Sequence, residues 1–365
     1  MGDSEVPQKK LEVRVATVDD YESVLDINRN VYGGADYIVT DYHDLVIDPD
    51  FRYYVCTVDG EVGGFEGVCI LDDGDTLMTR SARVKDKFQG LGILRLIRKQ
   101  IYQDFQSKPG KKRIRTCCTN LVRLVHSERF RKANRTLAVR NIFTVDSMHE
   151  MPAGALSPTE DAAIVSEVTL THFSDLLDDK QLMNFLFPEG FFTCISWFYD
   201  TRRSNVRHLA KISPYIVASN KLLEFSKRRT KPERQQGEMD NNTGSKNDAQ
   251  DEEIDSGLIG IMAGYGSPAM FLVSIDISGQ PTAGEEKKEI EQMIRAFIRQ
   301  IKVQYDQGGF DPKIPFAFGA FLQDRIDSKP FEEVLTDLGF TRDHEFSKQF
   351  KGSYMFEQSF EQLLD

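Results

Sequence analysis

One stretch of the sequence decides the fold, and it reads Val84-Lys85-Asp86-Lys87-Phe88-Gln89-Gly90-Leu91-Gly92-Ile93-Leu94. It follows a strand-like segment and precedes a helix whose apolar face carries Ile93, Leu96, Ile97, Ile101 and Phe105. Two glycines let the backbone turn tightly and approach a ligand closely. The start of the helix adds unpaired N–H groups and the positive end of the helix dipole. The stretch therefore predicts a backbone cradle for a pyrophosphate.

Two better-known phosphate loops do not fit this stretch. A P-loop needs Gly-Lys-Ser or Gly-Lys-Thr, which does not follow here. The dinucleotide fingerprint needs a third glycine and a first βαβ unit. The plain alternative is a loop that needs glycine only for its turn.

The elements around this stretch predict a mixed α/β sheet. Alternating apolar patterns indicate strands at 12–16, 51–58, 61–71, 76–84, 112–119 and 137–146. Helical spacing indicates helices at 18–31, 93–105 and 121–133. Three strands that follow one another and then two strand–helix units give a sheet with both parallel and antiparallel pairs.

Composition narrows the class of protein. The chain has 365 residues, 46 Lys and Arg against 57 Asp and Glu, and a net charge of −11. This length predicts about two domains, and the acidic balance argues against a protein that coats nucleic acid. Five cysteines are too few for a disulfide scaffold and form no metal-ligand pattern. With no secretory signal or spanning segment in the sequence, we expect a cytoplasmic protein without a membrane or metal partner.

The C-terminal third repeats part of the element order. Strands are expected at 269–277, 314–321 and 344–356, and helices at 290–305 and 330–338. This order predicts an internal duplication. The expected boundaries are a first domain over 11–150, a connecting segment and the start of the second domain over 151–225, a disordered linker over 226–256 and the second domain proper over 257–365.

The second copy lacks the Gly-x-Gly between its strand and its long helix. The residues at the start of that helix are acidic: Glu285, Glu286 and Glu289. Carboxylates at a helix N-terminus would repel a pyrophosphate. We therefore expect a degenerate copy without a cofactor, which covers or closes the substrate side of the first domain.

Gln89-Gly90-Leu91-Gly92-Ile93-Leu94 resembles the acetyl-CoA loop of the GNAT acetyltransferases, whose pattern is Gln/Arg-x-x-Gly-x-Gly/Ala. Gln89 and Gly92 match, whereas Leu94 replaces the last small residue. The resemblance implies a GNAT fold, with residues 257–365 as a degenerate GNAT-like domain, and acetyl-CoA as co-substrate of domain 11–150. It places the pantetheine along strand 77–84, with an oxyanion-binding N–H between Ala82 and Val84. The implied cofactor-binding residues are Ala82, Val84, Gln89, Gly90, Leu91, Gly92, Ile93 and Leu94.

A second resemblance concerns the acceptor. The segments Tyr32-Gly33-Gly34-Ala35-Asp36-Tyr37, Tyr42-His43 and Asp48-Pro49-Asp50 resemble the corresponding part of the vertebrate histidine N-acetyltransferases and their relatives. This implies transfer of acetyl to the α-amine of free histidine, a small-molecule substrate. Two alternatives stay open: a protein lysine or N-terminal acetyltransferase, for which an acidic surface suits a basic peptide, and a non-catalytic acyl-CoA-binding protein.

Glu66 is the candidate general base, because it interrupts an otherwise apolar strand and burial would raise its pKa. The alternative is an outward-facing position on that strand. Asp36 and Asp75 are weaker candidates. The family's usual acid, a tyrosine before the last strand, is replaced by Phe130, which leaves Ser127 or water.

The substrate pocket is expected in the loop after the first helix. Its candidates are Tyr37, Tyr42 and His43, which could stack on or hydrogen-bond an imidazole. Arg80 could hold an α-carboxylate as a bidentate fork. Each could instead be an ordinary surface or half-buried residue.

Overall fold

The computed structural model describes residues 9–110, 112–119, 123–148, 156–157, 162–195, 197–230, 253–267, 269–307, 316–323, 325–340 and 352–364. The chain divides into two compact units, and neither is continuous in sequence. The first unit takes residues 1–139, 265–272 and 352–365, and the second takes 140–264 and 273–351. The expected boundaries near 150 and 257 therefore do not separate the units, because both chain ends and one hairpin tip contribute to the first.

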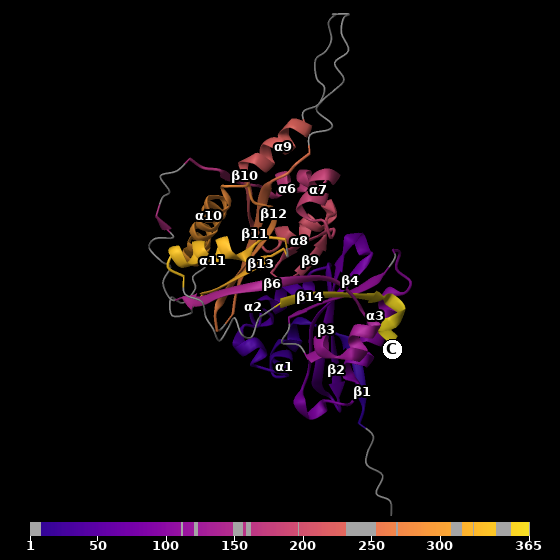
Figure 1. Ribbon diagram of the computed structural model, residues 1–365. Helices are drawn as coiled ribbons and strands as arrows, with labels where there is room; N and C mark the ends of the chain where they lie inside the picture. The colour runs from indigo at the N-terminus through magenta and orange to yellow at the C-terminus, as the bar shows by residue number, and fades with distance from the viewer. Residues whose placement is uncertain are drawn as a thin grey trace, which may run out of the picture. The chain divides into compact units, whose positions relative to one another are not determined.

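The first unit is a sheet with helices on both faces (Figure 1). Its strands, in spatial order, are β1 (Leu11–Val15), β2 (Phe51–Val58), β3 (Glu61–Leu71), β4 (Thr76–Val84), β5 (Arg113–Thr119) and β14 (Gly352–Ser359). All pairs are antiparallel except β4 and β5, which are parallel. The longer helices are α1 (Tyr21–Leu25), α2 (Ile38–Ile47), α3 (Ile93–Phe105) and α4 (Glu128–Ala133). Short 3-10 turns are η1 (Val18–Asp20), η2 (Val31–Gly34), η3 (Asp72–Gly74), η4 (Asp86–Phe88), η5 (Arg123–His126) and η8 (Phe360–Leu364).

Helix α3 packs on the sheet through one stripe of residues. Ile93, Ile97, Ile101 and Phe105 are buried at helical spacing, in one cluster with residues of β2, β3, β4 and β5. Gly64 of β3 makes this close packing possible, since a Cβ there would overlap the side chain of Ile93. The absence of a side chain at Gly64 therefore lets the first turn of α3 lie close against β3.

The two faces of this sheet carry different elements. The ring of Phe65 on β3 packs 6.0 Å from Tyr42 of α2, whereas its neighbour Glu66 points to the opposite face and contacts α3. Phe130 of α4 packs edge-on against Phe356 of β14, with the ring centroids 5.0 Å apart. Phe356 pairs with Thr116, whose hydroxyl meets that of Thr79 on the α3 face. The α2 face and the α3 face are therefore separate environments.

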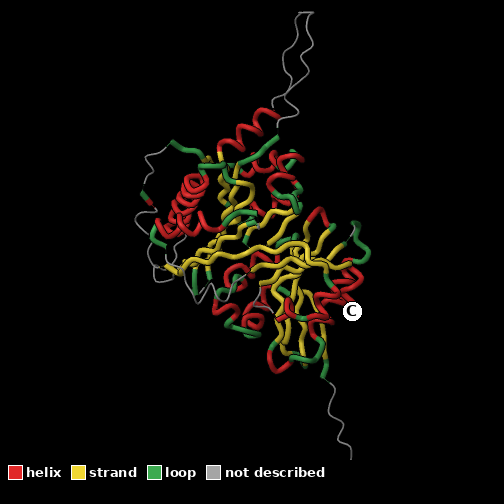
Figure 2. Tube along the Cα trace, in the orientation of Figure 1, coloured by secondary structure: helices red, strands yellow, loops and turns green. Residues whose placement is uncertain are grey.

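The second unit has the same order of elements. Its strands, in spatial order, are β6 (Arg135–Met148), β13 (Phe316–Leu322), β12 (Phe271–Gln280), β11 (Gly257–Gly266), β10 (Tyr215–Ser219) and β7 (Val165–Glu167), coloured yellow in Figure 2. Helix α10 (Glu286–Gln307) follows β12 as α3 follows β4, and α11 (Ser328–Asp337) precedes the last strand as α4 does. The remaining elements are α6 (Leu170–Leu176), α7 (Lys180–Leu186), β8 (Phe191–Cys194), β9 (Trp197–Asp200), η6 (Arg203–Asn205), α8 (Val206–Ala210) and α9 (Asn220–Thr230).

The two repeats exchange their last strands. Residues 137–146 were expected to end the first copy, but residues 141–148 of β6 pair with β13 in the second unit. The expected strand 344–356 lies outside the described residues up to 351, and β14 pairs with β5 of the first unit from Ser353–Thr119 to Ser359–Arg113. The duplication is therefore present, but each unit is completed by the other repeat.

Two other expectations are corrected. The single helix over 18–31 is broken into η1 and α1, and α2 follows where a loop was expected. Residues 226–230, placed in the disordered linker, form the end of α9, whose basic Lys227, Arg228 and Arg229 suit a helix C-terminus. The linker residues 231–252 lie outside the described part of the chain.

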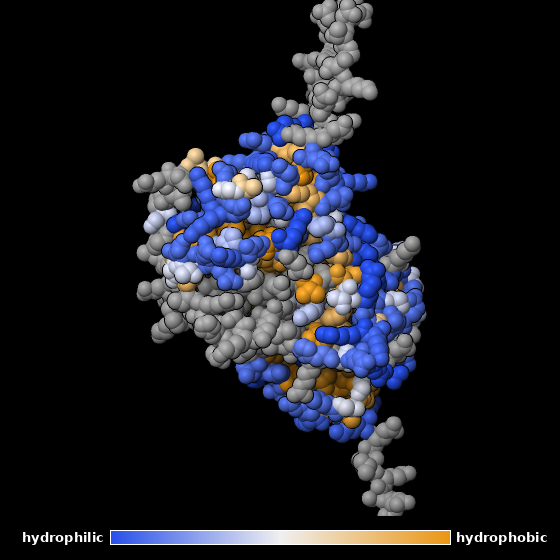
Figure 3. All heavy atoms as spheres, viewed as in Figure 1, coloured by the Kyte–Doolittle hydropathy of each residue, from blue (hydrophilic) through white to orange (hydrophobic). Residues whose placement is uncertain are grey.

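The described surface is mainly polar on the face shown in Figure 3, where blue residues predominate around separate orange patches. Among the described residues, the large hydrophobic side chains that stay exposed are Val18, Ile47 and Val303. No helix in the described ranges is both long enough and apolar enough to cross a membrane.

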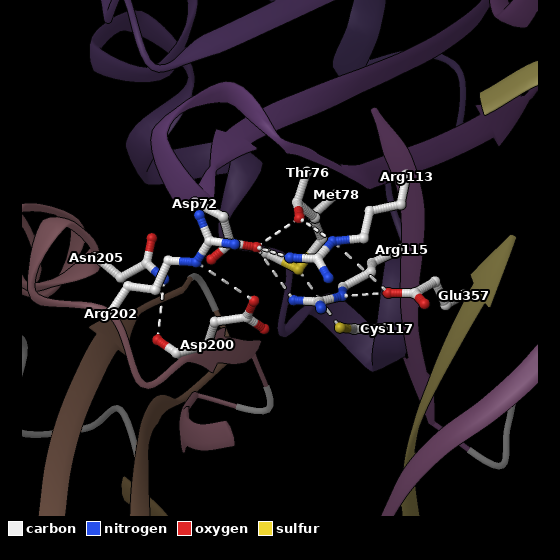
Figure 4. Close-up of polar contacts among 10 residues, drawn as sticks. All are labelled: Asp72, Thr76, Met78, Arg113, Arg115, Cys117, Asp200, Arg202, Asn205 and Glu357. Carbon is white, nitrogen blue, oxygen red and sulfur yellow. Dashed lines mark hydrogen bonds and ion pairs between the residues drawn. The ribbon is translucent and has the colours of Figure 1, made fainter. Parts of the chain in front are cut away.

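A buried charge network joins β14 to the rest of the first unit (Figure 4). Arg115 of β5 is 1% exposed, and its guanidinium lies 3.3 Å from Asp72 and 3.1 Å from Glu357 of β14. Asp72 is fully buried and accepts a hydrogen bond from Thr76. Because a buried cation must be neutralised, this network ties the C-terminal strand to the turn before β4.

Removal of the Asp72 charge should be strongly destabilising. In Asp72→Asn the Arg115 guanidinium loses one of its two carboxylates in a buried site, so we expect the free energy of unfolding to fall by about 3 to 5 kcal/mol. The measurement is urea unfolding followed by circular dichroism. Glu128→Gln, which breaks the exposed pair with Lys132, is the control and should leave stability unchanged. Equal stability of the two variants would show that the network does not hold β14.

Candidate acetyltransferase site

A β-bulge interrupts β4 in the middle of the sheet. Gly67 pairs with Arg80 and Phe65 pairs with Arg83, so Ser81 and Ala82 together oppose the single residue Glu66. Ser81 has φ of 57°, in the left-handed region. A bulge leaves the extra backbone group outside the ladder and increases the local twist. The bulge therefore leaves Ser81 and Ala82 outside the regular pairing with β3.

Beyond this point β4 diverges from β5. The two strands pair from Thr76–Arg113 to Thr79–Thr116, and among the described residues the pairing ends there. Within the described ranges, the part of β4 from Arg80 to Val84 pairs only with β3. Its other edge is therefore a strand edge next to the bulge, where an extended ligand can add main-chain hydrogen bonds.

The glycine-containing loop leads from this edge to α3. Gly90 and Gly92 have φ of 81° and 74°, and a Cβ built on either would meet nothing within 4 Å. Gly92 is the residue before the helix, and the first turn of α3 holds no acidic residue. The loop backbone is exposed and lies at the positive end of the helix dipole, which is the geometry that the predicted anion cradle requires.

The side chains of this loop are bound within the protein. Lys85 lies 2.6 Å from Asp26 and 2.8 Å from Glu61, and Lys87 lies 2.7 Å from Glu61. The Gln89 amide donates to Asp86 at 2.8 Å. Both lysines are therefore engaged with carboxylates of the first unit.

On the α2 face, the segment before α2 is attached to β4 on both sides of the bulge. The Asp36 carboxylate binds the Arg83 guanidinium at 2.7 and 3.3 Å, with both side chains 7% exposed. The Tyr37 hydroxyl lies 2.5 Å from the Ser81 hydroxyl. Asp36 is thus neutralised by Arg83 and holds the segment in place.

Two of the four predicted substrate residues come together here. The Arg80 side chain donates from Nε to the Tyr37 hydroxyl at 3.3 Å and lies 5.0 Å from the Tyr37 ring. Arg80 is 6% exposed, between the rings of Tyr37 and Phe51. Tyr37 is half-buried, so a ligand that enters would meet Tyr37 first, with Arg80 behind it.

The other two predicted substrate residues lie elsewhere. Tyr42 is fully buried and donates its hydroxyl to the Thr17 carbonyl at 2.7 Å. His43 is exposed and packs beside the ring of Tyr21 at 4.8 Å. The expected loop is helix α2, and helical spacing turns these two residues away from Tyr37.

Asp41 is a further candidate that the sequence patterns did not indicate. Its backbone N–H donates to the Tyr37 carbonyl at 2.9 Å, one helical turn earlier, and its carboxylate accepts from Thr40 at 2.8 Å. Desolvation raises the pKa of Asp41, while the charge of nearby Arg80 opposes that rise. Only the i, i+4 spacing from Tyr37 could have signalled it, and that required α2 to be recognised.

Glu66 lies on the α3 face. It is fully buried, so the outward-facing alternative is wrong, and its carboxylate binds Arg98 of α3 at 3.0 to 3.2 Å. The weaker candidate Asp75 lies at the start of β4, where its carbonyl accepts from the Arg113 N–H. Neither carboxylate joins the Tyr37–Arg80–Asp41 group.

Neither Ser127 nor Phe130, the residues at the position expected for the general acid, has an ionisable side chain. Phe130 packs against Phe356, and the Ser127 hydroxyl accepts a hydrogen bond from the Phe130 N–H as the cap of α4. Ser127 is therefore engaged in starting the helix.

In the second unit, the loop that corresponds to the glycine-containing loop donates backbone N–H groups to carboxylates of the following helix. The carboxylate of Glu289, 1% exposed, accepts from the Thr282 N–H at 2.8 Å, and Glu286 accepts from the Gly284 N–H at 3.0 Å. The loop amides are thus occupied by side chains of α10. Within the described ranges, no cluster of His, Cys, Asp and Glu could hold a metal ion.

The half-buried Asp41 carboxyl should make stability depend on pH. Its folded pKa is raised above the ordinary 3.8, so the folded state binds the proton more tightly than the unfolded state. The stability that protonation adds is present below 3.8 and lost as pH rises through the raised folded value. Urea midpoints between about pH 3 and pH 7 should therefore fall more steeply for the wild type than for Asp41→Asn. Equal slopes for the wild type and Asp41→Asn would contradict the assignment.

Comparisons with known proteins agree on the fold. No family model matches the chain. It is 31% identical over 86 residues to the histidine N-acetyltransferase of Oreochromis niloticus, which is 24% of this chain and 26% of that protein. It is 33% identical over 95 residues to "Probable N-acetyltransferase 16" of Homo sapiens, 26% of each chain. The chain thus spans about a quarter of the length of the curated relatives it matches.

The solved structures cover nearly the whole chain. A tandem GNAT protein from the clavulanic acid biosynthesis pathway has a TM-score of 0.54 at 11% identity, over 96% of this chain and 99% of that one. A GCN5-related N-acetyltransferase from Sphaerobacter thermophilus has a TM-score of 0.51 at 9% identity, over 96% of each chain. The chain therefore has the GNAT fold in a tandem arrangement, and its curated relatives are N-acetyltransferases.

Proposed function

We propose that the first unit is an acetyl-CoA-dependent N-acetyltransferase that acts on a small amine, with the α-amine of free histidine as the acceptor. The observation that carries the proposal is the bulge at Ser81 and Ala82. It lies between an anion cradle that leads to α3 and a polar group on the α2 face. A group transfer needs such a meeting point of donor and acceptor.

The residues on the donor side fit acetyl-CoA through their backbone. Ala82, Gln89, Gly90 and Gly92 are exposed, and Val84, Leu91 and Leu94 are half-buried. Ile93 is buried in the core, so only its backbone N–H is suited to binding. The edge of β4 would hold the pantetheine, and the amides from Gln89 to Leu94 the pyrophosphate. GNAT acetyltransferases use acetyl-CoA, and one solved relative in fold is described as a complex with coenzyme A.

The acceptor side offers an aromatic ring and a carboxylate one helical turn apart, Tyr37 and Asp41, and a cation from β4, Arg80. Tyr37 can stack on an imidazole, and Asp41 can pair with an ammonium or take its proton. Arg80 attracts a carboxylate from behind Tyr37. The names of the curated relatives favour histidine among amino acids with these groups.

The chemistry is one direct transfer. The neutral amine nitrogen attacks the thioester carbonyl carbon, and the C–S bond breaks as the amide C–N bond forms. We propose that the proton of the amine passes to Asp41 and that a backbone N–H at the bulge stabilises the oxyanion. The CoA thiolate leaves and takes a proton from water.

Thiol release with a panel of amines tests the function. We expect turnover with acetyl-CoA and L-histidine, and none with histone-like peptides. Gly92→Val should weaken CoA binding by at least about tenfold, because a side chain at the cradle blocks the approach of the phosphates. Isothermal titration should give one CoA per chain.

The second unit provides a matched control. Gly284 also has positive φ, 81°, and open space around a Cβ, so Gly284→Val causes similar strain outside the site. CoA binding should survive it. Turnover only with peptides would replace histidine by a protein acceptor, and CoA binding without turnover would make the chain a binding protein.

The base is tested by two carboxyl variants. Asp41→Asn should lower kcat/KM by about 10²-fold and remove the acidic limb of the pH–rate profile. Glu66→Gln should retain that limb and instead lower thermal stability, because it weakens the buried pair with Arg98. The reverse pattern would return the base to Glu66.

A further inference from the structure

The tip of the hairpin between β11 and β12 belongs to the first unit. Residues 265–272 group with residues 1–139, although most of both strands lies in the second unit. The turn is held locally, since the Ser267 N–H donates to the Met270 carbonyl at 2.9 Å and the Ser267 hydroxyl accepts from the Met270 N–H at 3.1 Å. A defined piece of the second repeat therefore lies within the first unit.

This hairpin tip is hydrogen-bonded to the start of α2. The Thr40 hydroxyl lies 3.1 Å from the Gly266 carbonyl, 3.1 Å from the Tyr37 carbonyl and 2.8 Å from the Asp41 carboxylate. One hydroxyl proton is thus within reach of the hairpin and of both residues assigned to the acceptor. A shift of the hairpin would therefore change which of the three acceptors binds the Thr40 hydroxyl proton.

The hairpin also packs tightly on the loop before α2. A Cβ built on Gly34 would lie 3.0 Å from the Cβ of Ala269, which is tighter than most such contacts, so a side chain there would have to displace the hairpin slightly. On the other side the same segment is attached to β4 through Asp36–Arg83 and Tyr37–Ser81. The segment from Gly34 to Asp41 is therefore held between β4 and the hairpin tip.

We infer that the hairpin tip 265–272 is a specificity-determining element of the acceptor site: it sets the position of Tyr37 and Asp41, and so the second repeat selects the amine. The inference rests on the proposed function. The glycine cradle and α3 lie on the donor side, away from this contact. The hairpin should therefore affect the acceptor and leave acetyl-CoA binding unchanged.

The full-length variant Ala269→Leu tests this inference. The larger side chain pushes on Gly34 and displaces the start of α2, so we expect KM for histidine to rise about tenfold. KM for acetyl-CoA should stay within about twofold. Ala283→Leu, an exposed site in the second unit, is the matched control and should change neither value.

Thr40 gives a second test from the α2 side. Thr40→Val removes the hydroxyl at nearly constant volume and should raise KM for histidine about fivefold, whereas Thr40→Ser should retain the wild-type value. Hydrogen exchange of the amides 38–47 should become faster in Ala269→Leu and stay unchanged in Ala283→Leu. Unchanged exchange together with an unchanged KM for histidine would overturn the inference.

Hydrogen exchange separates this inference from the proposed function. If the wild type acetylates no amine, the proposed function fails, and faster exchange of α2 in Ala269→Leu still shows that the hairpin positions that helix. If the wild type is active and both variants match it, the function stands and the hairpin has no part in the choice of acceptor.

Discussion

The first unit depends on one extra residue in β4. In a regular strand, residues 80 and 83 would point to opposite faces, because side chains alternate. Since Ser81 and Ala82 together oppose Glu66, Arg80 and Arg83 pair with Gly67 and Phe65 and share the α2 face. There Arg83 binds Asp36 and Arg80 binds Tyr37. The bulge thus attaches the α2 segment to the strand at the point where β4 leaves β5.

The exchange of last strands makes the two repeats interdependent. β5 would be an edge strand without β14, and it carries Arg115 into a buried site that needs the carboxylates of Asp72 and Glu357. A repeat cut at the end of its own sequence would lack a strand and half of this network. The two units are therefore defined by which strands pair with one another, and neither unit is one continuous range of the sequence.

Local patterns predicted much of the fold, and long-range pairing set the limit. The ranges of β2, β3 and β4 follow from alternation and the Asp59-Gly60 turn, and α3 follows from its apolar stripe. The bulge left no such pattern, because Ser81 and Ala82 are ordinary strand residues. The strand exchange left no pattern either, because the sequences of β6 and β14 would predict a strand whichever sheet each one joined. Helix α2 was missed because its short apolar stripe follows a glycine pair that reads as a loop.

In the candidate site, too, some features follow from the local sequence and others depend on residues of distant elements. The cradle stays a prediction, and it rests on local information, because its chemistry is in the backbone and glycine is visible in sequence. Tyr37 and Arg80, two of the predicted substrate residues, do lie in contact. Glu66 was chosen as an acid group among apolar neighbours, but Arg98, a residue of another element, gives it a structural partner. Asp41 is the opposite case, because no sequence pattern distinguishes it from the other charged residues of its segment. A carboxylate becomes a candidate base only when the fold withdraws water from it without supplying a close cation, and at Asp41 desolvation outweighs the attraction of Arg80. In the second repeat, the buried Glu289 carboxylate accepts a hydrogen bond from the Thr282 N–H, so a side chain of α10 already binds an amide of the corresponding loop.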